Sequence, residues 1–520
     1  MLIAYITPKK TEMAPKTQSS TGPITEGSAT ILPIANNTVF YNPAQVFNRD
    51  LSVLLLSVFA KSAASASLHI LEGLSASGLR SIRYINEVAG LTAITTNDLD
   101  STAVENITKN YLHNNIIPCA ETAVYKKIPD TKIVLKITNA DAILLMRQSP
   151  NVFDVIDLDP YGSASPFLDA AIANVKSGGL LAVTCTDSLV LNGNNTGTCY
   201  LRYGGVAVKA PYGHEQALRL VLGAMVTTAA RYKRKIKVLA SFSIDFYYRV
   251  FVRVDDDAQG ANESVRDIGV LMQCCNCEAF EMVRLGRPDT PTAQTSSGVA
   301  AAATEISQTK TSSGTSKPGR LTPGVSGACR ECSGPVAIGG PFYTGSIYDA
   351  DFLDLAIATV NDRDFDFPYI TVWDKIKGLL YGLRDELPDV PLFYSLSALS
   401  NSAKLPKNVK LSVFRKQLKL LGYRVSGSHR EPASIKTDAP AAVVYDVVRA
   451  YAQEIGFVPS EKTHALAKAI LAKKAPLEIV EKLDFTAVDD EAGRVVGVYL
   501  PNPTKNWGPK PAAKRRKVED

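Results

Sequence analysis

The strongest constraint on the fold lies between about residues 65 and 187, where short apolar runs alternate with amphipathic stretches. Runs such as SLHILE, FDVIDLD and LLAVTCTDS are rich in Val, Ile and Leu, as buried strands are, and segments such as SGLRSIRYINEVAG between them have the spacing of helices with one apolar face. Strands that alternate with helices pair in parallel, because each helix carries the chain back across the sheet. The pattern therefore predicts an α/β fold with a parallel, doubly wound sheet.

The length and composition bound the class of protein. Its composition, 46% hydrophobic and 21% charged, is that of a globular protein. Its length of 520 residues predicts more than one domain. No apolar run reaches the ~18 residues of a membrane span, so we expect no membrane contact. Eight cysteines are too few for a disulfide framework, which indicates a reducing compartment. The net charge of +6 is modest, so any contact with a polyanion must come from local patches.

Changes in composition divide the chain into four expected parts. Residues 1–22 are polar and are predicted to form a disordered leader, and residues 23–240 hold the alternating pattern. Residues 241–455 are expected to form a smaller α+β domain, interrupted at 288–323 by a low-complexity insertion. Residues 456–520 are predicted to be a basic tail, partly helical and partly disordered. Near the boundary at residue 240, IKVLASFSI and FYYRVFVRVD follow each other without a helix, which indicates antiparallel pairing.

Three strand ends in the alternating region carry residues suited to a nucleotide. The first strand leads into EGLSASGLRSIR, a compact loop that keeps only Gly78 of a glycine-rich loop and lets the backbone approach a ligand at a helix N-terminus. Asp98 follows about twenty residues later, where a carboxylate can accept hydrogen bonds from ribose hydroxyls. Asp141 and Ala142 follow the third strand, where an adenine edge would lie. Taken singly, each could be an ordinary cap or turn, but together they favour a nucleotide site.

The stretch DLDPYGS ends the fourth strand of this series. The carboxyl ends of parallel strands meet at one edge of a sheet, so Asp159, Pro160 and Tyr161 should face the same crevice as the nucleotide. This order of signals resembles S-adenosylmethionine (SAM) methyltransferases that act on exocyclic amines. Their corresponding tetrapeptide is Asp or Asn, two prolines and an aromatic residue, and DPYG departs from it by lacking the second proline.

The residue types of this turn suit methylation of a nucleobase amine. Such an amine is a poor nucleophile because its lone pair is delocalised into the ring. Asp159 could accept a hydrogen bond from one N–H and the Pro160 carbonyl from the other, which turns the lone pair toward the methyl donor. Tyr161 would stack on the base. The alternatives are a helix N-cap for Asp159 and a core position for Tyr161.

Further blocks make the resemblance more specific. VFYNPAQVFNRDLS, LSASGLRSIRY, DLDPYGSASPFLDAA and YGGVAVKAPYGHEQALR are similar to blocks of the tRNA guanine-26 N2-dimethyltransferase family, over roughly residues 23–450. The resemblance implies a Rossmann-like SAM methyltransferase domain and tRNA as partner. It also implies that Asp159 is the catalytic acidic residue and that the residues around SAM are Arg49, Arg80, Asp98, Asp141 and Ala142. A guanidinium at Arg49 could hold the methionine carboxylate through two hydrogen bonds.

Two alternatives stay open at this point. The same chemistry could act on another substrate, such as rRNA, DNA or a protein glutamine. A protein of a different class, which binds or folds RNA without catalysis, could keep the same fold, although the presence of both Asp98 and Asp159 argues against it. The sequence does not determine the oligomeric state, and a monomer is our default expectation.

Two CxxC pairs predict a metal site in the second domain. CCNC and CREC supply Cys274, Cys277, Cys329 and Cys332, a set typical of a structural tetrahedral Zn²⁺ site. The gap between the pairs is longer than usual, and the low-complexity insertion explains the excess. Four thiolates leave no position for a reactive water, so we expect the zinc to be structural. The family resemblance implies such a cluster as well.

Basic segments are candidates for RNA contact. RYKRKIK (231–237) and KAILAKKAP (468–476) could hold phosphates, although most such segments are solvated faces. SHREPASIKTDAP resembles a block of the family's C-terminal domain, which implies a tRNA-facing role for His429, Arg430 and Lys436.

The C-terminal PAAKRRKVED is typical of a nuclear localisation signal. Met1 and Met13 offer two possible starts, so a second, mitochondrial product stays open.

Overall fold

The computed structural model describes residues 22–33, 41–62, 67–118, 124–125, 132–288, 316–318, 327–362, 369–370, 372–431, 433–461 and 464–489. The predicted leader and nuclear signal, and most of the low-complexity insertion, lie outside these residues. Within them, no helix is both long enough and apolar enough to span a membrane.

A nine-stranded sheet dominates the molecule, in the order β10-β11-β9-β8-β3-β4-β7-β6-β5. Its five parallel strands are β3 (Leu68–Glu72), β4 (Leu91–Asp98), β7 (Lys132–Asn139), β8 (Val155–Leu158) and β9 (Gly179–Cys185). Its antiparallel edges are β10 (Arg234–Ile244) with β11 (Tyr247–Asp256), and β5 (Ile117–Pro118) with β6 (Val124–Tyr125). Every residue of β8 and β9 is buried, because helices cover both faces of a parallel sheet. The predicted α/β fold is confirmed.

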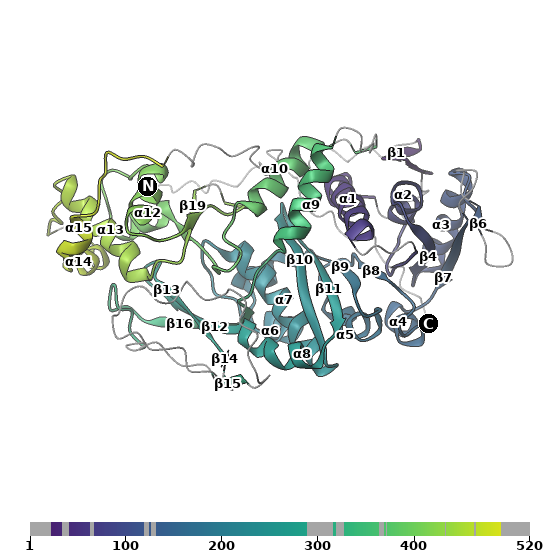
Figure 1. The fold of residues 1–520 in the computed structure, drawn as a ribbon, viewed down its shortest axis with the longest axis horizontal. Coiled ribbons are helices and arrows are strands. Elements are labelled where there is room, and N and C mark those ends of the chain that lie inside the picture. The colour runs from purple at the N-terminus through teal and green to yellow at the C-terminus, as the bar shows by residue number, and fades with distance from the viewer. Residues whose placement is uncertain are drawn as a thin grey trace, which may run out of the picture.

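The helices of this layer follow the strands as the alternating pattern predicted. They are α1 (Val46–Ser62), α2 (Leu79–Glu87), α3 (Ser101–His113), α4 (Ala142–Gln148), α5 (Ser165–Asn174), α6 (Thr196–Tyr203) and α7 (Gly213–Arg231), with the short turns η2 (Pro43–Gln45) and η3 (Val190–Asn194). A small ribbon of β1 (Ile24–Glu26) and β2 (Ala29–Ile31) precedes them. Figure 1 shows this layer occupying one end of an elongated molecule.

The expected boundary at residue 240 is wrong, because it falls inside β10. β11 pairs with both β10 and β9, so the hairpin completes the large sheet, which ends at Asp256. The run FYYRVFVRVD is buried on both faces over most of its length, as a strand between two others must be.

The remaining chain forms smaller sheets and helices. A three-stranded sheet contains β12 (Ile268–Cys274), β13 (Phe280–Arg284) and β16 (Val336–Tyr343), and two further small sheets contain β14 (Gly286–Pro288) with β15 (Ser316–Pro318), and β17 (Tyr394–Ser395) with β19 (Ser434–Thr437) and β18 (Val425–Ser426). The helices are α8 (Ala258–Glu263), η4 (Ser264–Asp267), α9 (Ala350–Asn361), α10 (Trp373–Arg384), α11 (Leu396–Ser402), α12 (Leu411–Leu420), α13 (Ala441–Glu454), α14 (Ala465–Leu471) and α15 (Leu477–Val480).

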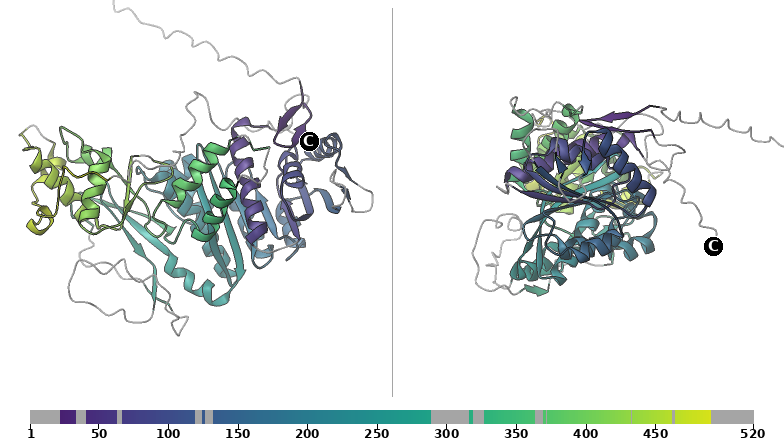
Figure 2. Two further views of the ribbon diagram at one scale, coloured as in Figure 1. Left: turned by 45° about the horizontal axis from the view of Figure 1, so that its top comes forward. Right: turned by 90° about the vertical axis from the view of Figure 1, so that its right-hand side faces the viewer.

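The hydrophobic cores divide the chain differently from the expected domains. One core runs from Ala29 to Phe393, and a second combines four cysteines with residues from Tyr394 to Ile470. Helices α9 and α10 therefore pack with α1 on the large sheet, although they lie within the expected second domain. Figure 2 shows them beside α1, while α12 to α15 gather at the far end.

Candidate functional site

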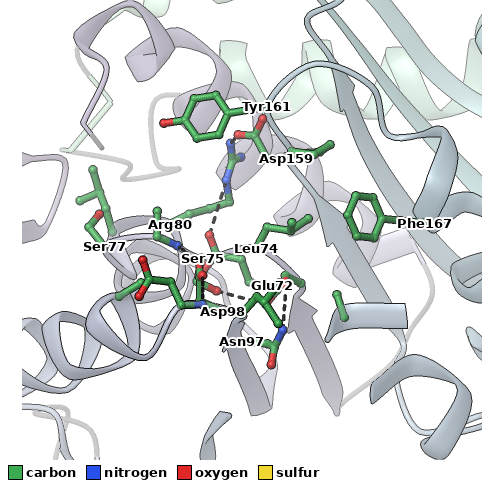
Figure 3. Close-up of a pocket in the computed structure, with 18 of the residues that line it drawn as sticks. Glu72, Leu74, Ser75, Ser77, Arg80, Asn97, Asp98, Asp159, Tyr161 and Phe167 are labelled. Atoms are coloured by element: carbon green, nitrogen blue, oxygen red, sulfur yellow. Dashed lines mark hydrogen bonds and ion pairs between the residues drawn. The ribbon is translucent and has the colours of Figure 1, made fainter. Parts of the chain in front are cut away.

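A cavity of about 1000 Å³ opens at the carboxyl edge of the parallel strands. Its lining includes eight of the nine residues predicted for the cofactor and the chemistry, namely Arg49, Arg80, Asp98, Asp141, Ala142, Asp159, Pro160 and Tyr161. Figure 3 shows Asp159 and Tyr161 near Arg80, with Asp98 and Glu72 on neighbouring elements. The volume lies at the upper end of the range for ligand pockets, so it suits a cofactor together with part of a substrate.

The loop between β3 and α2 is held tightly against the end of β4. The backbone N–H of Ala76 donates to Oδ2 of Asp98 at 2.8 Å, and that of Ser75 donates to the Asn97 carbonyl at 2.9 Å. Gly78 does not line the cavity but is the N-cap of α2, with a positive φ of 73°, and an added Cβ there would lie 3.2 Å from Ile107. A side chain there would be strained and crowded, which accounts for the glycine at this position of the loop.

Asp141 caps α4 as well as lining the cavity. Its Oδ1 accepts from the backbone N–H groups of Ile143 at 2.8 Å and Leu144 at 3.1 Å. The alternative that this residue is a helix cap is therefore correct, and a cap at this edge still leaves the residue at the cavity wall.

Arg49 lines the cavity, but its guanidinium already binds a carboxylate. Its Nε and Nη2 donate to the two oxygens of Glu26 from β1, and the group lies 5.5 Å from the centre of the Tyr41 ring. Burial alone would raise the pKa of Glu26, but Arg49 and Arg83 outweigh burial and lower it. Sequence reasoning missed Glu26, because it lies in a short strand far from the nucleotide loop.

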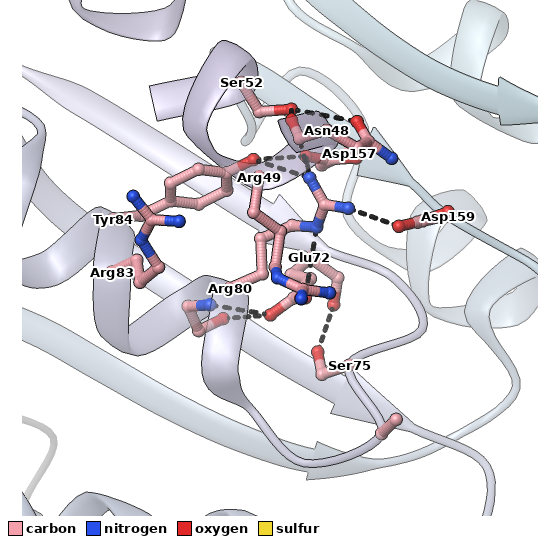
Figure 4. Close-up of polar contacts among 12 residues, drawn as sticks. Asn48, Arg49, Ser52, Glu72, Ser75, Arg80, Arg83, Tyr84, Asp157 and Asp159 are labelled. Atoms are coloured by element: carbon pink, nitrogen blue, oxygen red, sulfur yellow. Dashed lines mark hydrogen bonds and ion pairs between the residues drawn. The ribbon is translucent and has the colours of Figure 1, made fainter. Parts of the chain in front are cut away.

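Asp159 and its neighbour Asp157 have different surroundings. Asp157 is fully buried and accepts two hydrogen bonds of 2.9 Å from Arg249, plus one of 2.5 Å from Tyr84. Asp159 is 22% exposed and contacts Nη2 of Arg80 through Oδ2. Arg80 also approaches Asp157 at 3.7 Å, so it lies between the two acids (Figure 4). We call Arg80, Asp157, Asp159 and Arg249 the cleft network.

The two alternatives for the DPY turn do not hold. The residue that caps α5 is Ala164, with no side-chain hydrogen bond, so Asp159 is not a helix cap. Tyr161 is 53% exposed and therefore is not a core residue. Burial and the charges of Asp159 and Asp98 raise the pKa of Tyr161, so its hydroxyl stays neutral.

Glu72 adds a buried acid beneath the loop. It is fully buried, accepts hydrogen bonds from the backbone and hydroxyl of Ser81, and lies 3.9 Å from Arg80. Burial raises the pKa of Glu72 to about 8, against the opposing charge of Arg80.

The family model described as N2,N2-dimethylguanosine tRNA methyltransferase matches residues 20–449. The chain belongs to this family. It is 34% identical to the tRNA (guanine(26)-N(2))-dimethyltransferase of Homo sapiens, covering 94% of this chain and 77% of the relative. It is 35% identical to that of Schizosaccharomyces pombe, covering 96% and 93%. The solved complex of Trm1 from Pyrococcus horikoshii with S-adenosyl-L-methionine is similar with a TM-score of 0.64 and 26% identity, covering 82% of this chain and 99% of that one.

The four cysteines predicted in this family member come together at the end of β12. The Sγ atoms of Cys274, Cys277, Cys329 and Cys332 all lie within 4.8 Å of one another. A tetrahedron with Zn–S bonds of ~2.3 Å has S···S edges of ~3.8 Å. The sulfurs of Cys274 and Cys332 lie 3.4 Å apart and those of Cys277 and Cys329 lie 3.7 Å apart, close to this value. Backbone N–H groups of Asn276 and Glu331 point at two of the sulfurs. The set fits Zn²⁺, and the neighbouring Cys275 is exposed and outside it.

The cysteine quartet is clamped to α13. Arg449 of α13 forms an ion pair with Glu331, which lies between two of the cysteines, and the Tyr445 hydroxyl accepts from the Glu278 backbone N–H at 3.0 Å. A metal here would therefore fix the second core rather than act at the cavity.

Two of the three predicted RNA-contacting residues are in the interior. The Lys436 side chain has no exposed surface, and its ammonium contacts Glu386 and, at 3.1 Å, Glu215. His429 is also buried and forms a 2.8 Å hydrogen bond with Glu386 through Nδ1. We call Glu215, Glu386, His429 and Lys436 the sealed cluster. Phosphates cannot reach these groups, so the structure contradicts direct RNA contact by His429 and Lys436.

The other basic candidates are mixed. Arg430 is half-buried and has no carboxylate partner among the described residues. In the 231–237 segment, Arg234 is buried and pairs with Asp256, and Lys237 pairs with Asp349. In the 468–476 segment the lysines are exposed. The number of cations in a segment thus did not predict how many are available to a polyanion.

Proposed function

We propose that this chain transfers methyl groups from SAM to the N2 amine of guanine 26 in tRNA, twice, to form N2,N2-dimethylguanosine. One observation carries the proposal: the Asp159–Pro160–Tyr161 turn lines the same cavity as three nucleotide-type strand ends. Membership of the family supports the same reaction, because its human and fission yeast members are named tRNA (guanine(26)-N(2))-dimethyltransferase.

The cofactor would lie along the ends of β3, β4 and β7. SAM supplies a methyl group on a positively charged sulfur. Asp98 suits the ribose hydroxyls, Asp141 and Ala142 suit the adenine edge, and the Gly78 turn keeps the loop backbone close. Arg49 and Arg80 suit the methionine carboxylate by charge, and both line the cavity.

Asp159 would act directly on the amine. Its Oδ2 is held by Arg80, while Oδ1 has no partner among the described residues and is the acceptor that we assign to the N2–H. The Pro160 carbonyl would take the second N–H, and Tyr161 would stack on the base. Because Arg80 orients one oxygen, the carboxylate keeps its direction without rearranging during the reaction.

We infer that zinc at Cys274, Cys277, Cys329 and Cys332 is structural, since four thiolates complete its coordination. For tRNA contact we propose the exposed lysines of residues 468–476, which form no ion pair with a carboxylate among the described residues. The domain after Asp256 would provide this surface.

We also propose that the chain reaches the nucleus through KRRK near its end. The Saccharomyces cerevisiae relative, 32% identical, is named mitochondrial, which makes a mitochondrial form plausible.

The direct test incubates the full chain with SAM and a tRNA transcript, followed by digestion and mass spectrometry of nucleosides. A transcript with adenine at position 26 is the matched control. We expect dimethylguanosine only in the first. Methylation of rRNA, DNA or protein glutamine instead would transfer the chemistry to another substrate, and SAM binding without transfer to any of them would favour a non-catalytic RNA-binding protein.

A further inference from the structure

The turn between β10 and β11 brings an aromatic residue to the cavity. The two strands pair up to Ile244 and Tyr247, which leaves Asp245 and Phe246 as a two-residue turn. Asp245 has a positive φ of 46°, a conformation that Asp tolerates better than most residues. Phe246 is half-buried and lines the same cavity as Asp159. A two-residue turn leaves its backbone little freedom to move the ring elsewhere.

The strand order places Phe246 on the side of the cavity away from the cofactor. The nucleotide-type residues follow β3, β4 and β7, which all lie on one side of β8, and Asp159 follows β8 itself. The strands on the other side are β9, β11 and β10. Because β9 and β10 are both antiparallel to β11, β10 ends at the same edge as β8 and β9. Phe246, together with Thr186 after β9, therefore flanks Asp159 where the methyl acceptor must enter.

The second half of the chain holds this turn in place. Nη2 of Arg430 donates to the Asp245 carbonyl at 3.3 Å, and the Ser243 backbone N–H donates to Nε2 of His429 at 3.2 Å. The other ring nitrogen of His429 and its backbone N–H both bond to Glu386. The end of the hairpin is thus tied to the sealed cluster.

We propose that Phe246 is an aromatic wall of the guanine subsite and that Arg430 is a positioning residue which holds its turn. The inference rests on the proposed function. A guanine taken out of the tRNA stack loses its neighbouring bases, and aromatic side chains replace the lost contacts. Tyr161 supplies one such surface beside Asp159, and Phe246 supplies a second from the β10–β11 side.

The first test compares Phe246→Ala with Phe246→Tyr and Phe246→Leu. We expect kcat/KM for tRNA to fall roughly 10- to 100-fold in Phe246→Ala, by the usual strength of base stacking. Phe246→Tyr should restore most of the loss, and Phe246→Leu, which keeps apolar volume without an aromatic face, should restore less. SAM affinity, measured by calorimetry, should stay within about twofold of wild type in all three variants, because Phe246 lies on the side of the cavity away from the cofactor.

A half-buried phenylalanine outside the cavity, Phe485 next to Tyr451, gives the matched control Phe485→Ala. Its kcat/KM should stay near wild type at a temperature where both variants are folded. If Phe246→Ala and Phe485→Ala behave alike, or if Phe246→Leu restores activity as well as Phe246→Tyr, the stacking assignment is overturned. Failure of the wild type to form dimethylguanosine would instead refute the proposed function.

The second test is a double-mutant cycle with Arg430→Ala. If Arg430 acts through the turn, the double variant should lose no more activity than Phe246→Ala alone. If the losses multiply and Arg430→Ala lowers the salt dependence of tRNA binding, Arg430 contacts a phosphate by itself and the positioning role is overturned.

Discussion

The cleft network and the sealed cluster both consist of buried ion pairs, and they differ in whether one charged side chain is accessible from a cavity. Both join buried acids and bases from distant segments. The cleft network ends at Asp159, whose carboxylate is 22% exposed at the cavity, whereas the Lys436 side chain of the sealed cluster is fully covered. The sealed cluster joins α7 to the segment around β19 and so braces the two halves of the chain. Solvent access to the terminal charged side chain, rather than the presence of charge, therefore distinguishes a reactive site from a structural contact between two parts of the chain.

Two buried acids, Glu72 beside the cleft network and Glu386 in the sealed cluster, have pKa values that are shifted in opposite directions. Burial raises the pKa of Glu72, beside Arg80, to about 8. Burial acts on Glu386 too, but the charge of Lys436 and hydrogen bonds from Lys436 and His429 outweigh it, and the pKa of Glu386 falls to about 2.

The largest expected effect comes from the metal that pins the second core. Structural zinc contributes on the order of 10 kcal/mol to folding in small zinc-binding peptides. Cys329→Ser, or zinc removal by a chelator, should therefore unfold the region around α13 while SAM binding at the cavity persists. Hydrogen exchange of the two cores measures this, with Cys275→Ser as the control. Equal loss of hydrogen-exchange protection in both cores would show that the metal does not stabilise the second core separately from the first.

The next effect concerns the sealed cluster itself. Lys436→Met removes the ammonium partner of the buried Glu386, whereas Glu215 keeps its ion pair with Arg219, and breaking a buried pair in this way costs about 3–5 kcal/mol. We expect a lower melting temperature, with the single-turnover methylation rate of the folded fraction within a few-fold of wild type. Lys109→Met, at an exposed position of α3, is the matched control. A fall in the chemical rate at unchanged stability would show that Lys436 belongs to the reaction.

The smallest effect is the pH dependence of stability. Folded Glu72 holds its proton up to about pH 8 and the unfolded chain only to about 4.5, so its contribution is present at low pH and is lost as pH rises between these values. Glu386 has the opposite sign: its contribution is present above pH 4.5 and is lost as pH falls toward 2.

The unfolding free energies of Glu72→Gln and Glu386→Gln, measured against wild type, report these slopes. The wild-type advantage over Glu72→Gln should shrink from pH 5 to 8, and that over Glu386→Gln should shrink below pH 4.5. Slopes of the same sign for both variants would contradict the opposite pKa shifts of Glu72 and Glu386.

The spacing of apolar residues and the order of strands and helices along the chain predicted the fold and the position of the cavity residues. The parallel sheet follows from alternating runs, and Asp98, Asp141 and Asp159 meet because parallel strands end at one edge. Whether a charged side chain is buried could not be predicted from these patterns. Lys436 and its partner Glu215 are 221 positions apart, so nothing near SIKTDAP reveals that the ammonium is enclosed. Phe246 was missed for a similar reason, since its place depends on β10 lying parallel to β9 across an intervening strand.

The most direct test of the account is the single-turnover rate of methyl transfer to tRNA by Asp159→Ala, measured beside its SAM affinity. Removing one preorganised hydrogen-bonding group at a reacting centre usually costs about 10²–10³-fold in rate. We predict a loss of at least this size, with SAM bound within a few-fold of wild type. A near-normal rate in the folded variant would show that Asp159 does not activate the guanine amine.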